Sequence, residues 1–232
     1  FVQLTKADWK TDPAILLHLC RLGIPTGLQM SMITLGGMVL QSVLNGFGVV
    51  FVAGYTAANK LYGILESASV AFGYAMTAYM GQNRGARNAA RIDAGIRAVL
   101  VLSAEFTAAI VTAMLVAGKP LLGLFLSTEE AGAADALAVA YQYLMVLMAF
   151  LFALFMLQAY RSSLQGLGEM TVPTLSGFAE MLMRMGAALV LPTFIGQSGV
   201  FFAEGAAWVC AAALNLVWYY MRIGKIKREM MQ

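Results

Sequence analysis

One feature limits the fold more than any other: no charged residue occurs between Arg21 and Lys60. Over the chain of 232 residues, 60% are hydrophobic and 12% are charged, whereas a typical soluble domain has about a quarter charged residues. So few polar residues cannot cover the surface of a water-soluble core. A helix crosses the hydrocarbon of a membrane with roughly 20 apolar residues, so the uncharged run is long enough for more than one crossing. We therefore expect an all-α integral membrane protein.

The charge-poor runs divide the chain into six transmembrane helices. The sequence NGFG (Asn45–Gly48) supplies a turn between the first two spans. The predicted spans cover residues 23–46, 50–80, 95–117, 136–160, 171–194 and 203–221. Together they form a predicted transmembrane lobe over residues 23–221.

Two flanking segments complete the predicted organisation. Residues 1–22 are interpreted as a cytoplasmic interfacial amphipathic segment, with Asp12 as a helix cap, Pro13 in the first turn and a break at residues 23–25. Residues 222–232 form a basic cytoplasmic tail. The chain begins with Phe1 instead of Met, which we interpret as a sign of a longer protein.

Basic residues follow the alternation of the predicted loops. Twelve of the fifteen Lys and Arg residues fall on the face that receives both ends of the chain, including Arg161, which is assigned to the loop after the fourth span. The opposite face receives Lys119 and the acidic residues Glu129, Glu130, Asp135 and Glu204. Because cytoplasmic loops collect Lys and Arg, we predict a multi-pass plasma-membrane protein whose two ends are cytoplasmic.

Polar side chains inside the spans are the candidate functional residues, because a charge at membrane depth needs a partner or water. In the second span, polar residues recur in steps of three or four and form a polar line with Glu66 about halfway across. The members of this line are Tyr55, Asn59, Tyr62, Glu66, Ser69 and Thr77. Lys60 lies roughly 120° from Glu66 around the helix, so the two are not expected to pair. Glu180 and Arg184 have the spacing of an ion pair on one helix. The predicted substrate or ion pathway comprises Gln41, Asn45, Asn59, Lys60, Tyr62, Glu66, Glu180 and Arg184.

The sequence offers no arrangement for catalysis. It has one His and two Cys, and it lacks both a phosphate-binding glycine loop and a credible nucleophile–base set. Its basic clusters have no interleaved aromatic residues, which argues against nucleic acid. We therefore expect no enzyme, no metal site and no cofactor.

Five motifs, in this order, resemble the second half of a multidrug and toxic compound extrusion (MATE) transporter: RLGIPTGLQ, NGFG, VAGYTAANKL, YMGQNRGARNAARI and SSLQGLGEMTVP. GQNRGA is the most specific piece. The residues that carry the family pattern are Pro25, Gly81, Gln82, Asn83, Gly85, Gly166 and Gly168. Gly81 and Gly85 are expected to allow a tight helix exit, with Gln82 and Asn83 bonding the freed backbone groups.

The resemblance implies that the chain is the C-terminal lobe of a twelve-helix secondary transporter. Such a protein exports amphipathic, often cationic drugs or toxic compounds by alternating access, in exchange for H⁺ or Na⁺. Its implied partners are an N-terminal six-helix lobe of the same transporter, membrane lipid and a small amphipathic substrate. One branch of the family carries a glutamate near the position of Ile33, so the coupling carboxylate is expected either in the other lobe or at Glu66.

Two alternatives remain open. A flippase lobe for lipids or lipid-linked oligosaccharides, from the same larger exporter group, would be expected to carry more intramembrane basic residues than Lys60 and Arg184. A membrane scaffold that transports nothing has no use for Glu66 and its polar neighbours.

Overall fold

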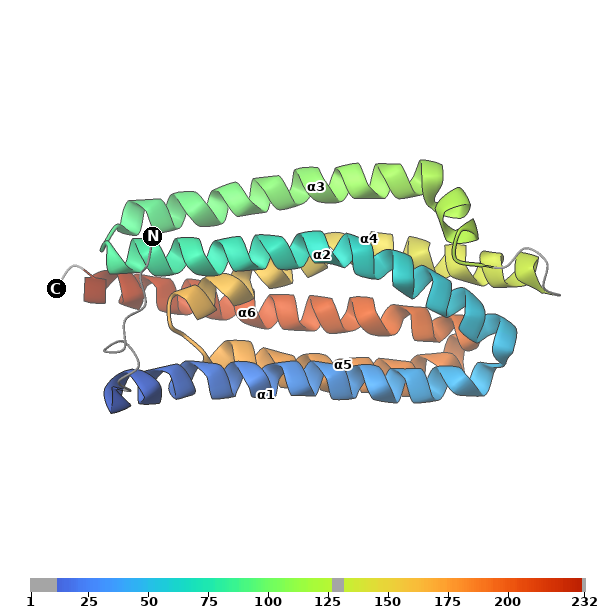
Figure 1. Ribbon diagram of the computed structural model, residues 1–232, viewed down its shortest axis with the longest axis horizontal. Helices are drawn as coiled ribbons and strands as arrows, with labels where there is room; N and C mark the ends of the chain where they lie inside the picture. Colours follow the sequence, from blue (N-terminus) through green and yellow to red (C-terminus); the bar gives the residue numbers. More distant parts are fainter. Residues whose placement is uncertain (1–11, 127–131, 231–232) are drawn as a thin grey trace, which may run out of the picture.

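Six long helices joined by short connections make up the computed structural model, which describes residues 12–126 and 132–230 (Figure 1). No strand occurs in these two ranges, so the predicted all-α fold class is confirmed. The elements are α1 (Pro13–Leu44), η2 (Asn45–Phe47), α2 (Val49–Gly85), α3 (Ala89–Gly123), α4 (Ala133–Gly166), α5 (Thr171–Ile195), η3 (Gln197–Phe201) and α6 (Phe202–Met230).

Some predictions fall on parts of the chain outside the described ranges. These are residues 1–11 of the interfacial segment, Glu129 and Glu130 of the loop after the third span, and the last two residues of the basic tail.

Five of the six helices, α1, α3, α4, α5 and α6, are long and apolar enough to cross a membrane. The remaining helix, α2, has 37 residues but is more polar, because it carries Asn59, Lys60, Glu66 and Arg84. It packs along α4, and this is the most extensive contact between any two helices of the bundle. Helix α2, the one of these six that is not a candidate span, therefore makes the most extensive contact within the lobe.

The helices run alternately in opposite directions, so the connections fall into two groups. The α2–α3 and α4–α5 connections, the start of α1 and the end of α6 share one end of the bundle, at the left in Figure 1. This is the grouping that the predicted loops require. The side of the membrane on which this end lies stays a prediction.

The start of α1 agrees with the sequence only in part. Asp12 caps the helix by accepting a hydrogen bond from the backbone N–H of Ala14 at 2.8 Å, and Pro13 occupies the first turn. The predicted break at residues 23–25 is wrong, because α1 continues through Pro25 to Leu44. A proline removes one helical hydrogen bond, but α5 packs against this turn and the Thr174 hydroxyl donates to the Pro25 carbonyl at 3.3 Å.

The predicted basic tail is also helical over its described part, since α6 runs to Met230. Arg222 forms an ion pair with Glu169 at 2.9 Å, and Lys227 one with Asp93 at 2.5 Å. The end of α6 is thus attached to the α4–α5 connection and to α3.

Close contact between α2 and α4 depends on glycines. A Cβ on Gly166 would collide with the backbone of Thr77, and one on Gly54 with the carbonyl of Ala136. Small residues let two membrane helices approach at backbone distance. Among the residues of the family pattern, Gly166 therefore has a clear packing role.

The ends of α2 and α4 share one hydrogen-bond pattern that explains other residues of the family pattern. At the end of α4 the N–H of Glu169 bonds the carbonyl of Leu164, and Gly168 has a φ of 73°. At the end of α2 the N–H of Asn88 bonds the carbonyl of Asn83, and the left-handed residue is Arg87, with a φ of 53°. Both are Schellman motifs, in which a left-handed residue closes the helix.

The predicted roles within GQNRGA are therefore largely wrong. Gly85 is not the left-handed residue, and a Cβ there would meet nothing within 4 Å. The Asn83 amide donates to the Tyr79 carbonyl at 2.8 Å inside the helix, not to a freed group. Gly81 is close to α4, but a Cβ there would make only an ordinary van der Waals contact, 3.4 Å from the Gly166 carbonyl oxygen.

Candidate functional site

A cavity of about 570 Å³ lies inside the lobe and is lined by α1, α2, α4, α5 and α6. Helix α1 packs along α5 and has almost no direct contact with α2 beyond the η2 connection. The lining includes Met30 on α1 and Tyr74 on α2, which are 56% and 72% exposed. The cavity therefore reaches the surface between α1 and α2, the two helices drawn apart in Figure 1.

Four charged side chains form a chain of ion pairs along one wall of the cavity. Arg161 of α4 contacts Glu180 of α5 at 2.5 Å, and Glu180 contacts Arg184 at 3.1 Å. Arg184 then reaches Glu204, in the first turn of α6, at 2.7 Å. We call Arg161, Glu180, Arg184 and Glu204 the ion-pair chain. It joins three helices with two positive and two negative groups.

The ion-pair chain also reaches α1. The Nη1 atom of Arg184 donates to the Ile33 carbonyl at 2.9 Å, and Nη2 of Arg161 donates to the Ser176 hydroxyl at 3.4 Å. The side chains of Arg161, Glu180 and Arg184 are buried, so their charges depend on these partners. The predicted Glu180–Arg184 pair is thus confirmed, within a larger network.

Glu66 lines the same cavity from α2 but stands apart from this network. Its carboxylate is half-buried, and no basic group among the described residues lies within 4.0 Å of it. The cavity lining contains three carboxylates and two guanidinium groups. One carboxylate is in excess, and by geometry it is that of Glu66.

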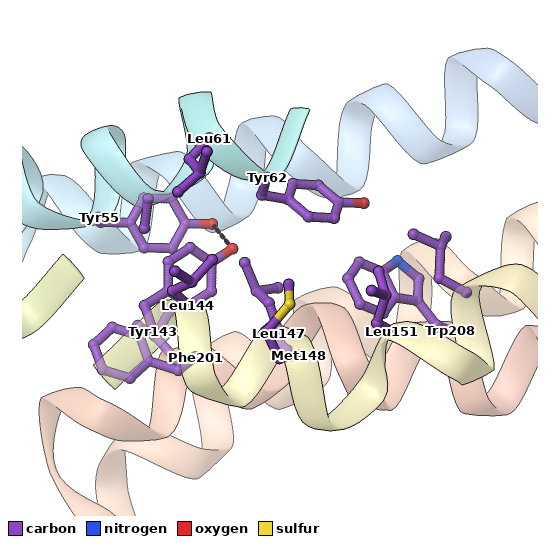
Figure 2. Packing of buried hydrophobic residues seen from close by; sticks show 14 of the residues in the cluster. Tyr55, Leu61, Tyr62, Tyr143, Leu144, Leu147, Met148, Leu151, Phe201 and Trp208 are labelled. Carbon is purple, nitrogen blue, oxygen red and sulfur yellow. Dashed lines mark hydrogen bonds between the residues drawn. The ribbon is translucent and has the colours of Figure 1, made fainter. Parts of the chain in front are cut away.

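Aromatic rings flank Glu66 on the cavity wall. Tyr62, one helical turn before Glu66, stacks on Trp208 of α6 with ring centroids 5.5 Å apart (Figure 2). Asn59 lies a further turn along α2 and also lines the cavity. The polar line predicted on α2 therefore faces the cavity from Asn59 to Glu66.

The same polar line ends in the apolar core at Tyr55. Figure 2 shows its hydroxyl bonded to that of Tyr143, and Tyr143 donates at 3.0 Å. The two rings stack with centroids 4.3 Å apart, and Phe201 stacks on Tyr143. Tyr55 thus belongs to the packing between α2 and α4.

Three residues of the predicted pathway do not line the cavity. Gln41 and Asn45 bond each other at 3.1 Å and are exposed near the α1–α2 connection. Lys60 is exposed on α2 and is absent from the cavity lining. The structure brings together Asn59, Tyr62, Glu66, Glu180 and Arg184.

The sequence predicts membrane-face positions for two residues that instead line the cavity: Arg161 in a loop, and Glu204 at the start of the sixth span. Arg161 and Glu204 lie inside α4 and α6, and both belong to the ion-pair chain. A usable signal was present for α4, because its cavity residues have the spacing of one helical face. These are Gln158, Arg161, Ser162 and Gln165.

Gln29 was missed altogether. It is fully buried in α1, lines the cavity, and accepts a hydrogen bond from Gln165 of α4 at 3.0 Å. Gly177 of α5 makes room for it, since a Cβ there would contact the Gln29 side chain. It carries no charge to mark it inside the span, and its partner Gln165 lies 136 residues away in the sequence.

The side chains that line the cavity are suited to binding a ligand through charge, hydrogen bonds and aromatic contacts. Within the described ranges, no group of three or more His, Cys, Asp or Glu residues is placed to hold a metal ion. The groups present are one unpaired carboxylate, amides, aromatic faces and a neutral ion-pair chain.

Two curated relatives from Bacillus subtilis (strain 168) align with most of the chain. "Probable multidrug resistance protein YpnP" is 30% identical over 226 residues, and "Probable multidrug resistance protein YoeA" is 26% identical over 223 residues. Each alignment covers 94% of this chain and 47% of the relative. The chain thus spans about half the length of the curated relatives it matches.

Solved structures show the same fold. A MATE transporter in complex with MaL6 superimposes with a TM-score of 0.87 at 21% identity, over 98% of this chain and 51% of its own. A MOP superfamily transporter from Pyrococcus furiosus also gives a TM-score of 0.87, at 22% identity, over 97% of this chain and 50% of its own. The MatE family model matches residues 25–190. The chain belongs to the MATE family of membrane transporters and corresponds to one half of a full-length member.

Proposed function

We propose that this chain is the C-terminal lobe of an antiporter that exports amphipathic cations, and that Glu66 contacts the positive charge of the substrate. The observation that carries the proposal is the unpaired carboxylate of Glu66 in a cavity whose other charges are paired. The multidrug-resistance names of the two Bacillus relatives support an amphipathic substrate.

The cavity wall suits such a compound. Tyr62, Tyr74 and Trp208 present aromatic rings, and a ring face attracts an organic cation by about 0.5–2 kcal/mol. Met30 and Met170 add flexible side chains that adapt to different shapes. The two arginines of the cavity repel a cationic substrate only weakly, because neighbouring carboxylates neutralise their charge.

Export of the substrate is coupled to entry of the driving ion if the two compete for Glu66. A proton or Na⁺ bound to the carboxylate excludes the positive charge of the substrate, and release of the ion restores the binding site. Alternating access requires the second lobe to face the opening between α1 and α2. Within this proposal the protein lies in the plasma membrane and the basic end of the lobe is cytoplasmic.

The flippase alternative has less support. A pyrophosphate group needs free basic side chains, whereas Arg161 and Arg184 each contact a carboxylate in the described part of the cavity. Lys60 lies away from the cavity.

The test is the Glu66→Gln variant in the complete transporter, assayed by ethidium efflux from membrane vesicles under a proton or Na⁺ gradient. The amide keeps the shape of the side chain and removes the charge. We expect efflux to fall about tenfold or more, since a charge-assisted contact contributes about 1.5–3 kcal/mol.

Glu105→Gln is the matched control, because Glu105 is exposed on α3 and does not line the cavity. Efflux in this variant should match the wild type. Unchanged efflux in Glu66→Gln, with unchanged dependence on both gradients, would refute the proposed role of Glu66.

A further inference from the structure

A second hollow lies between α2 and α3, on a different face of α2 from the cavity. It has a volume of about 540 Å³ and is lined only by residues of these two helices. We call it the α2–α3 groove; its lining is one face of each helix, within residues 71–79 of α2 and 94–102 of α3. Eight helical steps correspond to a length of about 12 Å, which accommodates part of an acyl chain.

The lining of the α2–α3 groove is apolar and combines small side chains with larger ones. Ala75 and Ala98 are exposed, and Phe72, Val99 and Leu102 lie around them. Helix α3 contributes nothing to the lining of the functional cavity. Its outer surface carries Val101, Phe106 and Val116, which are exposed and apolar, so this face is suited to contact with lipid.

One end of the groove carries a positive charge in a fixed position. Tyr79 lines the groove, and the Arg91 guanidinium lies over its ring, 5.7 Å from the centroid. The Tyr79 hydroxyl in turn donates to the Arg91 carbonyl at 2.9 Å. Gly95 allows this arrangement, because a Cβ there would collide with the Tyr79 ring.

The surroundings of Arg91 leave this charge available. Asp93 is paired with Lys227 and Glu169 with Arg222. Arg91 is exposed and forms no ion pair with a described residue. It lies at the end of the bundle that the basic loops predict to be cytoplasmic, where the membrane leaflet carries anionic lipids.

We propose that the α2–α3 groove binds a phospholipid with an anionic headgroup. One acyl chain lies along residues 71–79 and 94–102, and the phosphate contacts Arg91. Guanidinium binds phosphate oxygens through two parallel N–H donors, and an arginine already held over an aromatic ring loses little freedom when it does so.

Native mass spectrometry of the delipidated, full-length transporter tests this site with two probes, phosphatidylglycerol and phosphatidylcholine of identical acyl chains. We expect the wild type to bind phosphatidylglycerol more tightly. Arg91→Gln should weaken phosphatidylglycerol binding about fivefold, the usual effect of one basic residue at an anionic membrane surface. Phosphatidylcholine carries the same phosphate, but its choline neutralises the charge of the headgroup, so its binding should fall less.

A second variant tests the apolar part of the site. Ala98→Phe fills the groove and should weaken the binding of both lipids, and Ala98 is exposed enough for the protein to fold normally. The matched controls are Arg97→Gln and Ala104→Phe, which change exposed residues of α3 outside the groove. Neither control should alter lipid binding.

Equal binding of the two lipids by the wild type would overturn the proposal. So would equal losses in Arg91→Gln and Arg97→Gln, since these indicate a diffuse surface charge instead of a site. Unchanged binding in Ala98→Phe would exclude the groove as the place of the acyl chain.

Discussion

The two sides of the cavity hold their charges in different ways. On the side of α4, α5 and α6, Arg161, Glu180, Arg184 and Glu204 neutralise one another over distances of 2.5–3.1 Å. On the side of α2, Glu66 has aromatic and amide neighbours and no cationic partner among the described residues. Both sides line the same cavity, so they differ in whether their charges are paired and not in where they lie.

This difference in pairing predicts different roles for the two sides: the ion-pair chain stabilises the fold, and Glu66 binds the substrate. Buried ion pairs add little net stability, because desolvation offsets their attraction, but the loss of one partner leaves an uncompensated charge. We therefore expect variants of the ion-pair chain to act mainly on folding. An unpaired carboxylate beside a cavity can accept an external cation, so Glu66 variants should act mainly on binding.

The largest effect on stability should come from Arg184, which contacts two carboxylates and the Ile33 carbonyl. In Arg184→Gln, Glu204 loses its cation and α1 loses a bond to α5. We expect the free energy of unfolding to fall by about 3–5 kcal/mol, seen as a lower thermal midpoint of the full-length protein in detergent. A wild-type midpoint would show that the ion-pair chain does not hold the helices together.

A smaller effect is expected at the end of the ion-pair chain. Arg161→Gln removes one of the two cations beside Glu180, but Arg184 remains 3.1 Å away. The expected loss is about 1–3 kcal/mol, measured by the same thermal unfolding. If Arg161→Gln proved more harmful than Arg184→Gln, the assignment of Arg184 as the centre of the network would be wrong.

The smallest change in stability should occur at Glu66. No ion pair within the described chain is broken by Glu66→Gln, so the free energy of unfolding should stay within about 0.5 kcal/mol of the wild type. Glu105→Gln, on the exposed face of α3, sets the scale of a neutral change. A loss comparable with that of Arg161→Gln would mean that Glu66 is a structural charge after all.

The fold was largely predictable because charge-poor runs and their boundaries are local features of the sequence. Each predicted span lies within one helix, apart from the last two residues of the first span. The predicted break at Pro25 failed because a neighbouring helix stabilises the turn. Packing between segments about 150 residues apart is not encoded in any local pattern.

The site was predictable only in part, for the same reason. Glu66 and the Glu180–Arg184 pair are visible as charges inside apolar runs. Arg161 and Glu204 lie near the ends of such runs, where a charge is read as part of a loop, and only the long helices of the structure place them inside. Which carboxylates are paired and which are not depends on contacts between helices, so this could not be predicted from the sequence.

The most direct test of the central claim is a comparison of two ligands. The affinity of the full-length transporter is measured by isothermal titration calorimetry for an amphipathic monovalent cation and for a neutral compound of the same shape, in the wild type and in Glu66→Gln. We predict that Glu66→Gln weakens cation binding about tenfold and leaves the neutral compound unaffected. Equal affinities of the two proteins for the cation, or equal losses for both ligands, would contradict the claim that Glu66 recognises the positive charge.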